Sequence, residues 1–158
     1  KGIGGVLSLK KVVFVCTGNT CRSSMAEALF RKMLQELGKH KEFEVASYGI
    51  AAVKGQPASE NAKKVMEMEG IDLTNHRAKL FTQDVTEADL ILTMTQSHKD
   101  HIINRYPEAK GKVFLLGEFV GDNMEISDPF GQGIDIYKKA AEEIKQKLWK
   151  VIERMEKN

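Results

Sequence analysis

One stretch near the start of the chain limits the possible folds more than any other: residues 12–23, VVFVCTGNTCRS. Its first four residues are apolar and mostly β-branched, which predicts a buried strand. Small turn-forming residues follow, and an amphipathic helical pattern begins at Ser24. The stretch therefore predicts a strand, a tight loop and a helix N-terminus, with Cys16 at the first corner and Arg22 at the last.

The chemistry of such a loop is specific. Backbone N–H groups of a tight loop that enters a helix form an anion cradle, and the helix dipole adds partial positive charge. Arg22 supplies a planar fork that matches phosphate oxygens, and the same field favours the thiolate of Cys16. Gly18 and Asn19 tolerate the left-handed backbone angles that a tight loop needs. We therefore predict a covalent phosphoryl-transfer site in which Cys16 is the nucleophile.

The rest of the chain alternates strand and helix patterns, which predicts a parallel sheet covered on both faces. In such sheets the ligand lies beyond the carboxyl ends of the strands, where Cys16 is expected. Ser23 or Ser24, Ser59 and Ser97 are expected to cap three of the helices. Strands are predicted at residues 11–16, 43–47, 90–94 and 113–116, helices at 24–37, 62–69, 97–105 and from 134, a helical turn at 84–88, and a long loop at 117–133.

Composition narrows the class of protein. The 158 residues suffice for one domain with a core, which we assign to residues 11–158, with residues 1–10 as an N-terminal extension. A net charge of +2 gives no electrostatic reason to expect binding to nucleic acid or to a membrane surface. The sequence also has no apolar run of membrane-spanning length. The two cysteines, Cys16 and Cys21, both lie in the predicted phosphate-binding stretch at residues 12–23. This placement favours a reduced, cytoplasmic protein over a disulfide-bonded secreted one.

A second candidate element is Asp128-Pro129. Phosphoryl transfer to Cys16 requires a proton for the leaving group, and a loop aspartate could supply it. Proline biases Asp128 away from the helical region and stiffens the loop. By itself an Asp-Pro pair is more often only a turn or a helix start.

Taken together, the stretches VCTGNTCRSSMAE and SDPFG resemble the low-molecular-weight protein tyrosine phosphatase family. The resemblance covers residues 11 to the C-terminus. It implies a flavodoxin-like α/β fold with a four-stranded parallel sheet and helices on both faces. It also implies catalysis without metal or cofactor, through a cysteinyl-phosphate intermediate, on phosphorylated protein substrates. We expect a monomer.

The resemblance also assigns roles to individual residues. It places the nucleophile on Cys16, the phosphate-clamping arginine on Arg22 and the general acid, later the base, on Asp128. The hydroxyl that stabilises the thiolate falls on Ser23. Supporting residues are Asn19, Ser47 and His76, and the remaining expected substrate contacts come from Thr17, Gly18, Thr20, Cys21 and Phe130. Without the resemblance, Ser47 would be a strand-end serine and His76 a polar loop residue. Ser24 stands where the family often has proline.

Thr20 bears on the substrate. Tyrosine-specific members usually carry a bulkier aliphatic residue there, whereas members that resemble bacterial protein-arginine phosphatases carry threonine. Its hydroxyl could bind a polar guanidine or an attacking water, and Phe130 would supply one aromatic wall while Gly131 leaves its neighbour open. Thr20 could also be only a β-branched filler. We favour phosphoarginine as the substrate, with phosphotyrosine as the alternative.

Three other functions remain open. Arsenate reductases coupled to thioredoxin share this loop but need cysteines beyond Cys21. A catalytically silent phosphate-binding module is expected to lack Cys16, Arg22 or Asp128, and all three are present. A redox switch, in which Cys16 and Cys21 form a disulfide that protects the nucleophile, is compatible with phosphatase activity. Cys21 could instead be a small buried thiol that packs under the loop.

Overall fold

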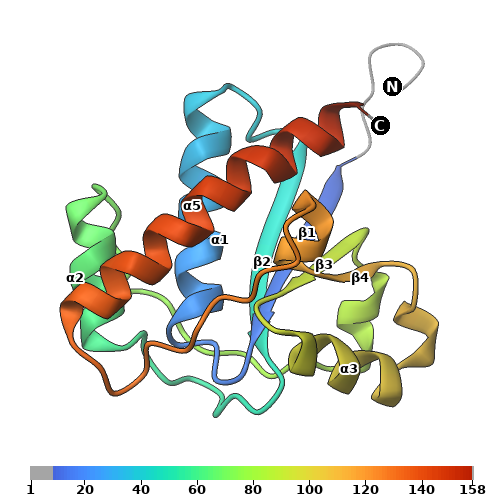
Figure 1. The fold of residues 1–158 in the computed structure, drawn as a ribbon, viewed down its shortest axis with the longest axis horizontal. Coiled ribbons are helices and arrows are strands. Elements are labelled where there is room, and N and C mark those ends of the chain that lie inside the picture. Colours follow the sequence, from blue (N-terminus) through green and yellow to red (C-terminus); the bar gives the residue numbers. More distant parts are fainter. Residues whose placement is uncertain (1–8, 158) are drawn as a thin grey trace.

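The computed structural model describes residues 9–157. It contains a four-stranded sheet with all strands parallel, in the order β2-β1-β3-β4 (Figure 1). The strands are β1 (Lys10–Cys16), β2 (Phe43–Gly49), β3 (Leu90–Thr93) and β4 (Val113–Leu115). The predicted α/β fold is confirmed. The predicted extension at residues 1–10 falls mostly outside the described residues and stays a prediction.

Helices cover both faces of the sheet. Helices α1 (Arg22–Glu36), α2 (Glu60–Met68) and α5 (Ile134–Lys157) lie on one face and α3 (Gln96–Arg105) on the other (Figure 1). The remaining helical elements are short: η2 (Gln83–Glu87), η3 (Pro107–Ala109) and α4 (Leu116–Val120). Among the described residues, no helix combines the length and apolar character needed to cross a membrane.

The alternation of side chains along β1 explains why this strand is central. Val12 and Phe14 enter the larger core cluster with α1 and α5, whereas Val13 and Val15 enter the smaller cluster with α3. All four are completely buried, as expected for a strand covered on both faces. The rigid packing around β1 fixes the position of its last residue, Cys16.

Three sequence expectations need correction. Helix α1 begins at Arg22 and its N-cap residue is Cys21, without a side-chain cap; the hydroxyls of Ser23 and Ser24 bind other partners. The cap of α3 is Thr95, not Ser97. Ser59 does cap α2, by accepting from the Ala62 amide.

The third correction concerns residues 117–133, predicted to be loop throughout. Helix α4 begins at Leu116, directly before this region, and runs to Val120, because Leu116 and Phe119 are buried in the larger core cluster. Gly117 is the cause of the wrong prediction, since glycine usually indicates a loop. Here it is required by close packing: a Cβ atom on Gly117 would lie 2.3 Å from the Met124 carbonyl oxygen.

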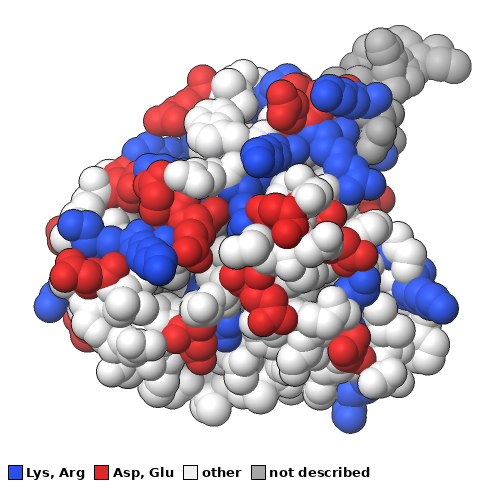
Figure 2. Space-filling model, viewed as in Figure 1, with Lys and Arg blue, Asp and Glu red and all other residues white. Residues whose placement is uncertain are grey.

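Positive and negative side chains are intermixed on the one face that Figure 2 shows. On the face shown in Figure 2, lysine and arginine side chains alternate with aspartate and glutamate, and no large area carries a single sign of charge. Long-range electrostatic attraction of a polyanion therefore has no obvious origin on this face.

Candidate active site

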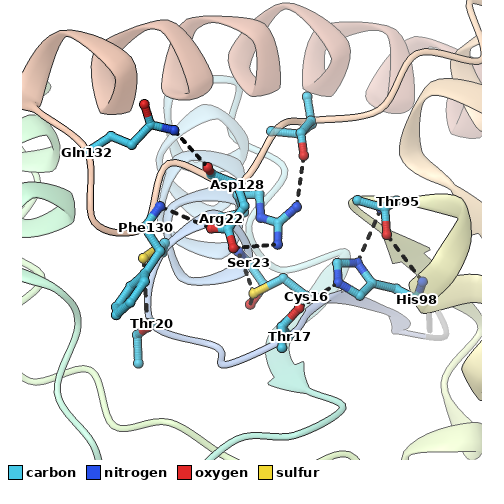
Figure 3. A network of polar contacts seen from close by, with 12 residues as sticks. Cys16, Thr17, Thr20, Arg22, Ser23, Thr95, His98, Asp128, Phe130 and Gln132 are labelled. Atoms are coloured by element: carbon cyan, nitrogen blue, oxygen red, sulfur yellow. Dashed lines mark hydrogen bonds and ion pairs between the residues drawn. The ribbon is translucent and has the colours of Figure 1, made fainter.

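The candidate site is built around the β1–α1 loop, residues 17–21, at the carboxyl edge of the sheet (Figure 3). The first turn of α1 has no side-chain cap, and its Ser23 amide instead contacts Cys16 Sγ at 3.4 Å. The absence of a serine cap at Ser23 or Ser24 is thus consistent with an anion cradle, which uses the same N–H groups.

Asn19 holds this loop in shape. It is fully buried and has a positive φ of 59°, a conformation that asparagine tolerates better than most residues. Its side-chain amide donates to Ser23 Oγ (2.8 Å) and Ser47 Oγ (2.9 Å), and its Oδ1 accepts from the Lys79 amide. His76 Nε2 donates to the Asn19 carbonyl oxygen (2.6 Å). The structure therefore brings Ser47 and His76 together around Asn19, from segments far apart in the sequence.

Cys16 lies at the end of β1 under this loop. Its Sγ is 2.9 Å from Ser23 Oγ and accepts a longer contact, 3.4 Å, from the Ser23 amide. Both contacts, together with the N-terminus of α1, stabilise negative charge on sulfur. The geometry suits a thiolate nucleophile.

Arg22 is 4% exposed and borders the same cleft. Its Nη1 donates to the Ile126 carbonyl oxygen (2.9 Å), and its Nη2 lies 3.7 Å from Asp128 Oδ2. Its Nε is buried and has no hydrogen-bond partner among the described residues. A buried N–H without a partner is costly in a folded protein, so this group is well suited to bind an anionic oxygen.

Asp128 and Phe130 form the outer wall of the cleft. Asp128 Oδ1 accepts from the Phe130 amide (3.1 Å), which links the orientations of the two residues, and Phe130 is 69% exposed. The cleft measures about 500 Å³ and is also lined by the predicted residues Cys16, Thr17, Gly18, Thr20, Cys21 and Arg22. An exposed carboxylate and an aromatic ring thus stand at the mouth of a cleft that has a thiol at its base.

Cys21 is the buried N-cap residue of α1. Both cysteines are free thiols, and Cys21 Sγ contacts Ser59 Oγ and the Tyr137 hydroxyl, each at 3.3 Å. Burial, together with the hydrogen bond to Cys21, raises the pKa of Tyr137 to about 12. Tyr137 therefore stays neutral and can donate to the Cys21 sulfur.

Sequence reasoning did not find His98, which is buried beside the loop. Its Nε2 lies 2.9 Å from Thr17 Oγ1, and its Nδ1 accepts from the Thr95 amide (3.2 Å), as Figure 3 shows. Burial, followed by the positive charge of Arg22, lowers the pKa of His98 to about 4. The only sequence signal was its place three residues after Thr95, the glutamate or glutamine position of a capping box.

Other parts of residues 9–157 offer no competing centre for this chemistry. No three histidine, cysteine, aspartate or glutamate side chains gather there as a metal site would require. A larger cavity of about 880 Å³ is lined by charged side chains such as Arg31, Lys32 and Arg77, but by no cysteine. We place the chemistry in the smaller cleft, because it contains the Cys16 thiol beside Arg22.

Comparison with known proteins finds similar phosphatases. A protein-arginine-phosphatase of Geobacillus stearothermophilus is 40% identical over 148 residues, covering 92% of this chain and 96% of its own. A low molecular weight protein tyrosine phosphatase structure from T. tengcongensis is 45% identical, with a TM-score of 0.87 and coverage of 92% and 99%. A YwlE arginine phosphatase mutant with a phosphorylated active site serine is 37% identical, with a TM-score of 0.89 and coverage of 94% and 97%.

The family assignment rests on nearly the whole chain. The sequence pattern of the low molecular weight phosphotyrosine protein phosphatases matches residues 11–158, which include the β1–α1 loop and the Asp128 segment. By fold, by the cysteine and arginine that flank its β1–α1 loop and by this match, the chain belongs to the low molecular weight phosphotyrosine protein phosphatase family.

Proposed function

We propose that this protein is a cysteine-dependent protein phosphatase that hydrolyses phosphorylated arginine side chains. The observation that carries the substrate assignment is Thr20, a small hydroxyl-bearing residue in the wall of the cleft. Two of the similar proteins are named arginine phosphatases, and one of these carries a phosphorylated serine in its active site. A phosphorylated residue in that relative supports a covalent phosphoenzyme here.

In the first step the Cys16 thiolate attacks phosphorus. The P–N bond of phosphoarginine breaks, and its electron pair leaves on the guanidine nitrogen, which takes a proton from the Asp128 carboxyl group. Arg22 binds two phosphoryl oxygens through its fork, including the Nε–H that has no partner among the described residues. The backbone N–H groups of the loop share the remaining charge.

In the second step water attacks the phosphorus of the phosphocysteine. Asp128, now a carboxylate, takes one proton from that water. The S–P bond breaks, its electron pair returns to Cys16, and inorganic phosphate is released. Ser23 stabilises the departing thiolate, since its hydroxyl is 2.9 Å from the sulfur.

Thr20 separates the two candidate substrates. Its Oγ1 lies 3.7 Å from Cys21 Sγ, a weak contact that leaves the hydroxyl able to bind a guanidine nitrogen. An aliphatic residue here would favour an aromatic ring by burial and would leave a guanidine without that hydrogen bond. The tyrosine alternative is supported by the exposed ring of Phe130 and by the name of the T. tengcongensis structure.

The test is kcat/KM on phosphoarginine and phosphotyrosine versions of one peptide. We expect the wild type to prefer phosphoarginine, and Thr20→Ile to lose about tenfold on phosphoarginine while gaining on phosphotyrosine. Thr20→Ser is the matched control, because it keeps the hydroxyl and should retain the preference. A wild-type preference for phosphotyrosine would overturn the arginine assignment and leave a tyrosine phosphatase.

Cys21 is proposed as a redox partner of Cys16. Peroxide oxidises a thiolate to a sulfenic acid, and attack by a second thiol then releases water and forms a disulfide. Mild peroxide should therefore remove both free thiols together and reversibly, as measured by thiol counting before and after dithiothreitol. Irreversible loss of activity with the Cys21 thiol still free would exclude this role.

A further inference from the structure

His98 occupies an unusual place between two elements. It is the third residue of α3 and only 3% exposed, at the carboxyl end of β3, beside the β1–α1 loop. With Thr95 it forms a capping box: Thr95 Oγ1 accepts from the His98 amide, and His98 Nδ1 accepts from the Thr95 amide. One edge of the imidazole is thus used to begin α3.

These contacts determine the tautomer. Because Nδ1 accepts a backbone N–H, it cannot carry a proton, so the neutral ring carries its proton on Nε2. The partner of Nε2 is Thr17 Oγ1 at 2.9 Å, and the imidazole must therefore be the donor. The low pKa of His98, caused first by burial and then by Arg22, keeps the ring in this neutral state.

The capping box alone does not explain a histidine. A capping box needs only an acceptor at this position, which glutamate or glutamine supplies. Imidazole adds a donor on its opposite edge, and that donor reaches across to the residue immediately after Cys16. The second contact therefore points to a role in the loop rather than in the helix.

Thr17 is placed to connect the hydrogen bond from His98 to a group bound in the cleft. Its side chain lines the cleft with Cys16 and Arg22, and it is exposed rather than packed in the core. With one oxygen lone pair occupied by His98, the Thr17 hydroxyl proton has to turn away from the imidazole. His98 is the single hydrogen-bond partner of this hydroxyl among the residues the structure describes.

We propose that His98 is a positioning residue for phosphoryl transfer, which orients the Thr17 hydroxyl so that it donates to the phosphoryl group bound above Cys16. The chain of donors runs from the Thr95 amide to His98, from His98 to Thr17, and from Thr17 to a phosphoryl oxygen. It adds one fixed donor to the loop amides and Arg22. The inference rests on the proposed phosphatase function but not on the choice of phosphoarginine.

The test uses p-nitrophenyl phosphate and inhibition by inorganic phosphate, so that arginine specificity does not enter. Thr17→Val removes the hydroxyl at nearly constant volume, and we expect kcat/KM and phosphate affinity to fall about tenfold. Thr17→Ser should keep most of both. His98→Gln should retain kcat/KM within about threefold, because its amide can accept from Thr95 and donate to Thr17.

A double-mutant cycle separates this role from a merely structural one. His98→Ala should lower phosphate affinity, and adding Thr17→Val to it should cost little more, because the two residues act as one unit. His101→Gln, an exposed histidine one turn further along α3, is the control and should behave as the wild type.

Several outcomes would overturn the proposal. Fully additive losses in the cycle would do so, and so would wild-type phosphate affinity in Thr17→Val. A nitrogen chemical-shift spectrum that puts the His98 proton on Nδ1 at pH 7 would also contradict it. If the wild type hydrolyses no phosphate ester or phosphoarginine, the proposed function itself fails, whereas an active wild type with an equally active Thr17→Val removes only this inference.

Discussion

At the scale of single residues, the candidate site has a buried cation suited to anion binding and an exposed carboxylate suited to proton transfer. Arg22 is held by the Ile126 carbonyl and is almost inaccessible, whereas the Asp128 side chain is about half exposed. Removing the acid should therefore affect proton transfer much more than anion binding. The two functions are separable by mutation.

We expect Asp128→Asn to lower kcat on phosphoarginine by about 10²- to 10³-fold, because the leaving nitrogen then lacks its proton donor. The loss should be smaller on p-nitrophenyl phosphate, whose leaving group needs no proton. Phosphate inhibition should change little.

Cys16→Ser should show no turnover, and a serine variant with wild-type turnover would refute the thiol mechanism.

His98 gives a pH dependence of stability. Its folded pKa of about 4 lies below its ordinary value of 6.5, so the folded state holds fewer protons than the unfolded state between these values. The contribution of His98 to the free energy of unfolding is then fully present above pH 6.5 and is lost as the pH falls toward 4. From pH 7.5 to 4.5 this one group should cost about 2.5 kcal/mol of unfolding free energy.

Urea unfolding of the wild type and His98→Gln at both pH values measures this effect. The pH dependence of the glutamine variant should be smaller by about that amount, since glutamine does not titrate. An equal change in unfolding free energy between the two pH values in both proteins would show that His98 is not held neutral.

Residues differ in how far the sequence could predict them. Cys16 and Arg22 could be proposed as site residues because a strand, a loop and a helix start surround them, and that local context is visible in the sequence. Asp128 needed the resemblance, since Asp-Pro pairs are common. His98 was missed because its two partners, Thr95 and Thr17, are 3 and 81 positions away, and only folding brings the second one close.

At the scale of elements, the β1–α1 loop depends on the end of β2. Gly49 is the last residue of β2 and packs directly against this loop. A Cβ atom at Gly49 would lie 2.5 Å from the Thr17 carbonyl oxygen and 2.9 Å from the Asn19 amide nitrogen. Both neighbours are backbone atoms, so the loop itself would have to move.

We therefore expect Gly49→Ala to cost about 1–3 kcal/mol of stability and to lower kcat/KM more than tenfold. Gly133→Ala is the matched control, because a Cβ atom there would have no neighbour within 4 Å and the φ of Gly133 is not positive. Circular dichroism melts and steady-state kinetics on both variants provide the measurement. Full activity in Gly49→Ala would mean that the loop tolerates displacement.

The elements were predictable where hydrophobic periodicity was strong. The buried strands and the long amphipathic α5 follow from their patterns, and these predictions are confirmed. Helix α4 was missed because its core contacts, through Leu116 and Phe119, are tertiary and outweigh the glycine between them. The start of α1 was misplaced because neither serine caps the helix: Ser23 Oγ contacts Cys16 Sγ, and Ser24 Oγ donates to the Cys21 carbonyl oxygen.

At the scale of the whole molecule, the site joins segments that are distant in sequence. Arg22 in α1 binds Ile126 in the segment before α5, Asn19 binds Ser47 in β2, and Thr17 binds His98 in α3. An anion bound at the β1–α1 loop would add contacts to a region whose hydrogen bonds already connect several elements at the carboxyl edge of the sheet. Binding energy should therefore appear as global stability.

Inorganic phosphate at 100 times its dissociation constant should stabilise the folded state by about 2.7 kcal/mol. For a chain of this length that corresponds to a rise in Tm of about 5–10 °C. Asp128→Asn should keep this shift, whereas Arg22→Lys should lose most of it, because an ammonium cannot offer the Nε–H and the fork to phosphate oxygens together. Each variant is compared with its own melt in chloride at equal ionic strength. An equal phosphate shift in Arg22→Lys would place the anion away from Arg22 and would contradict the proposed site.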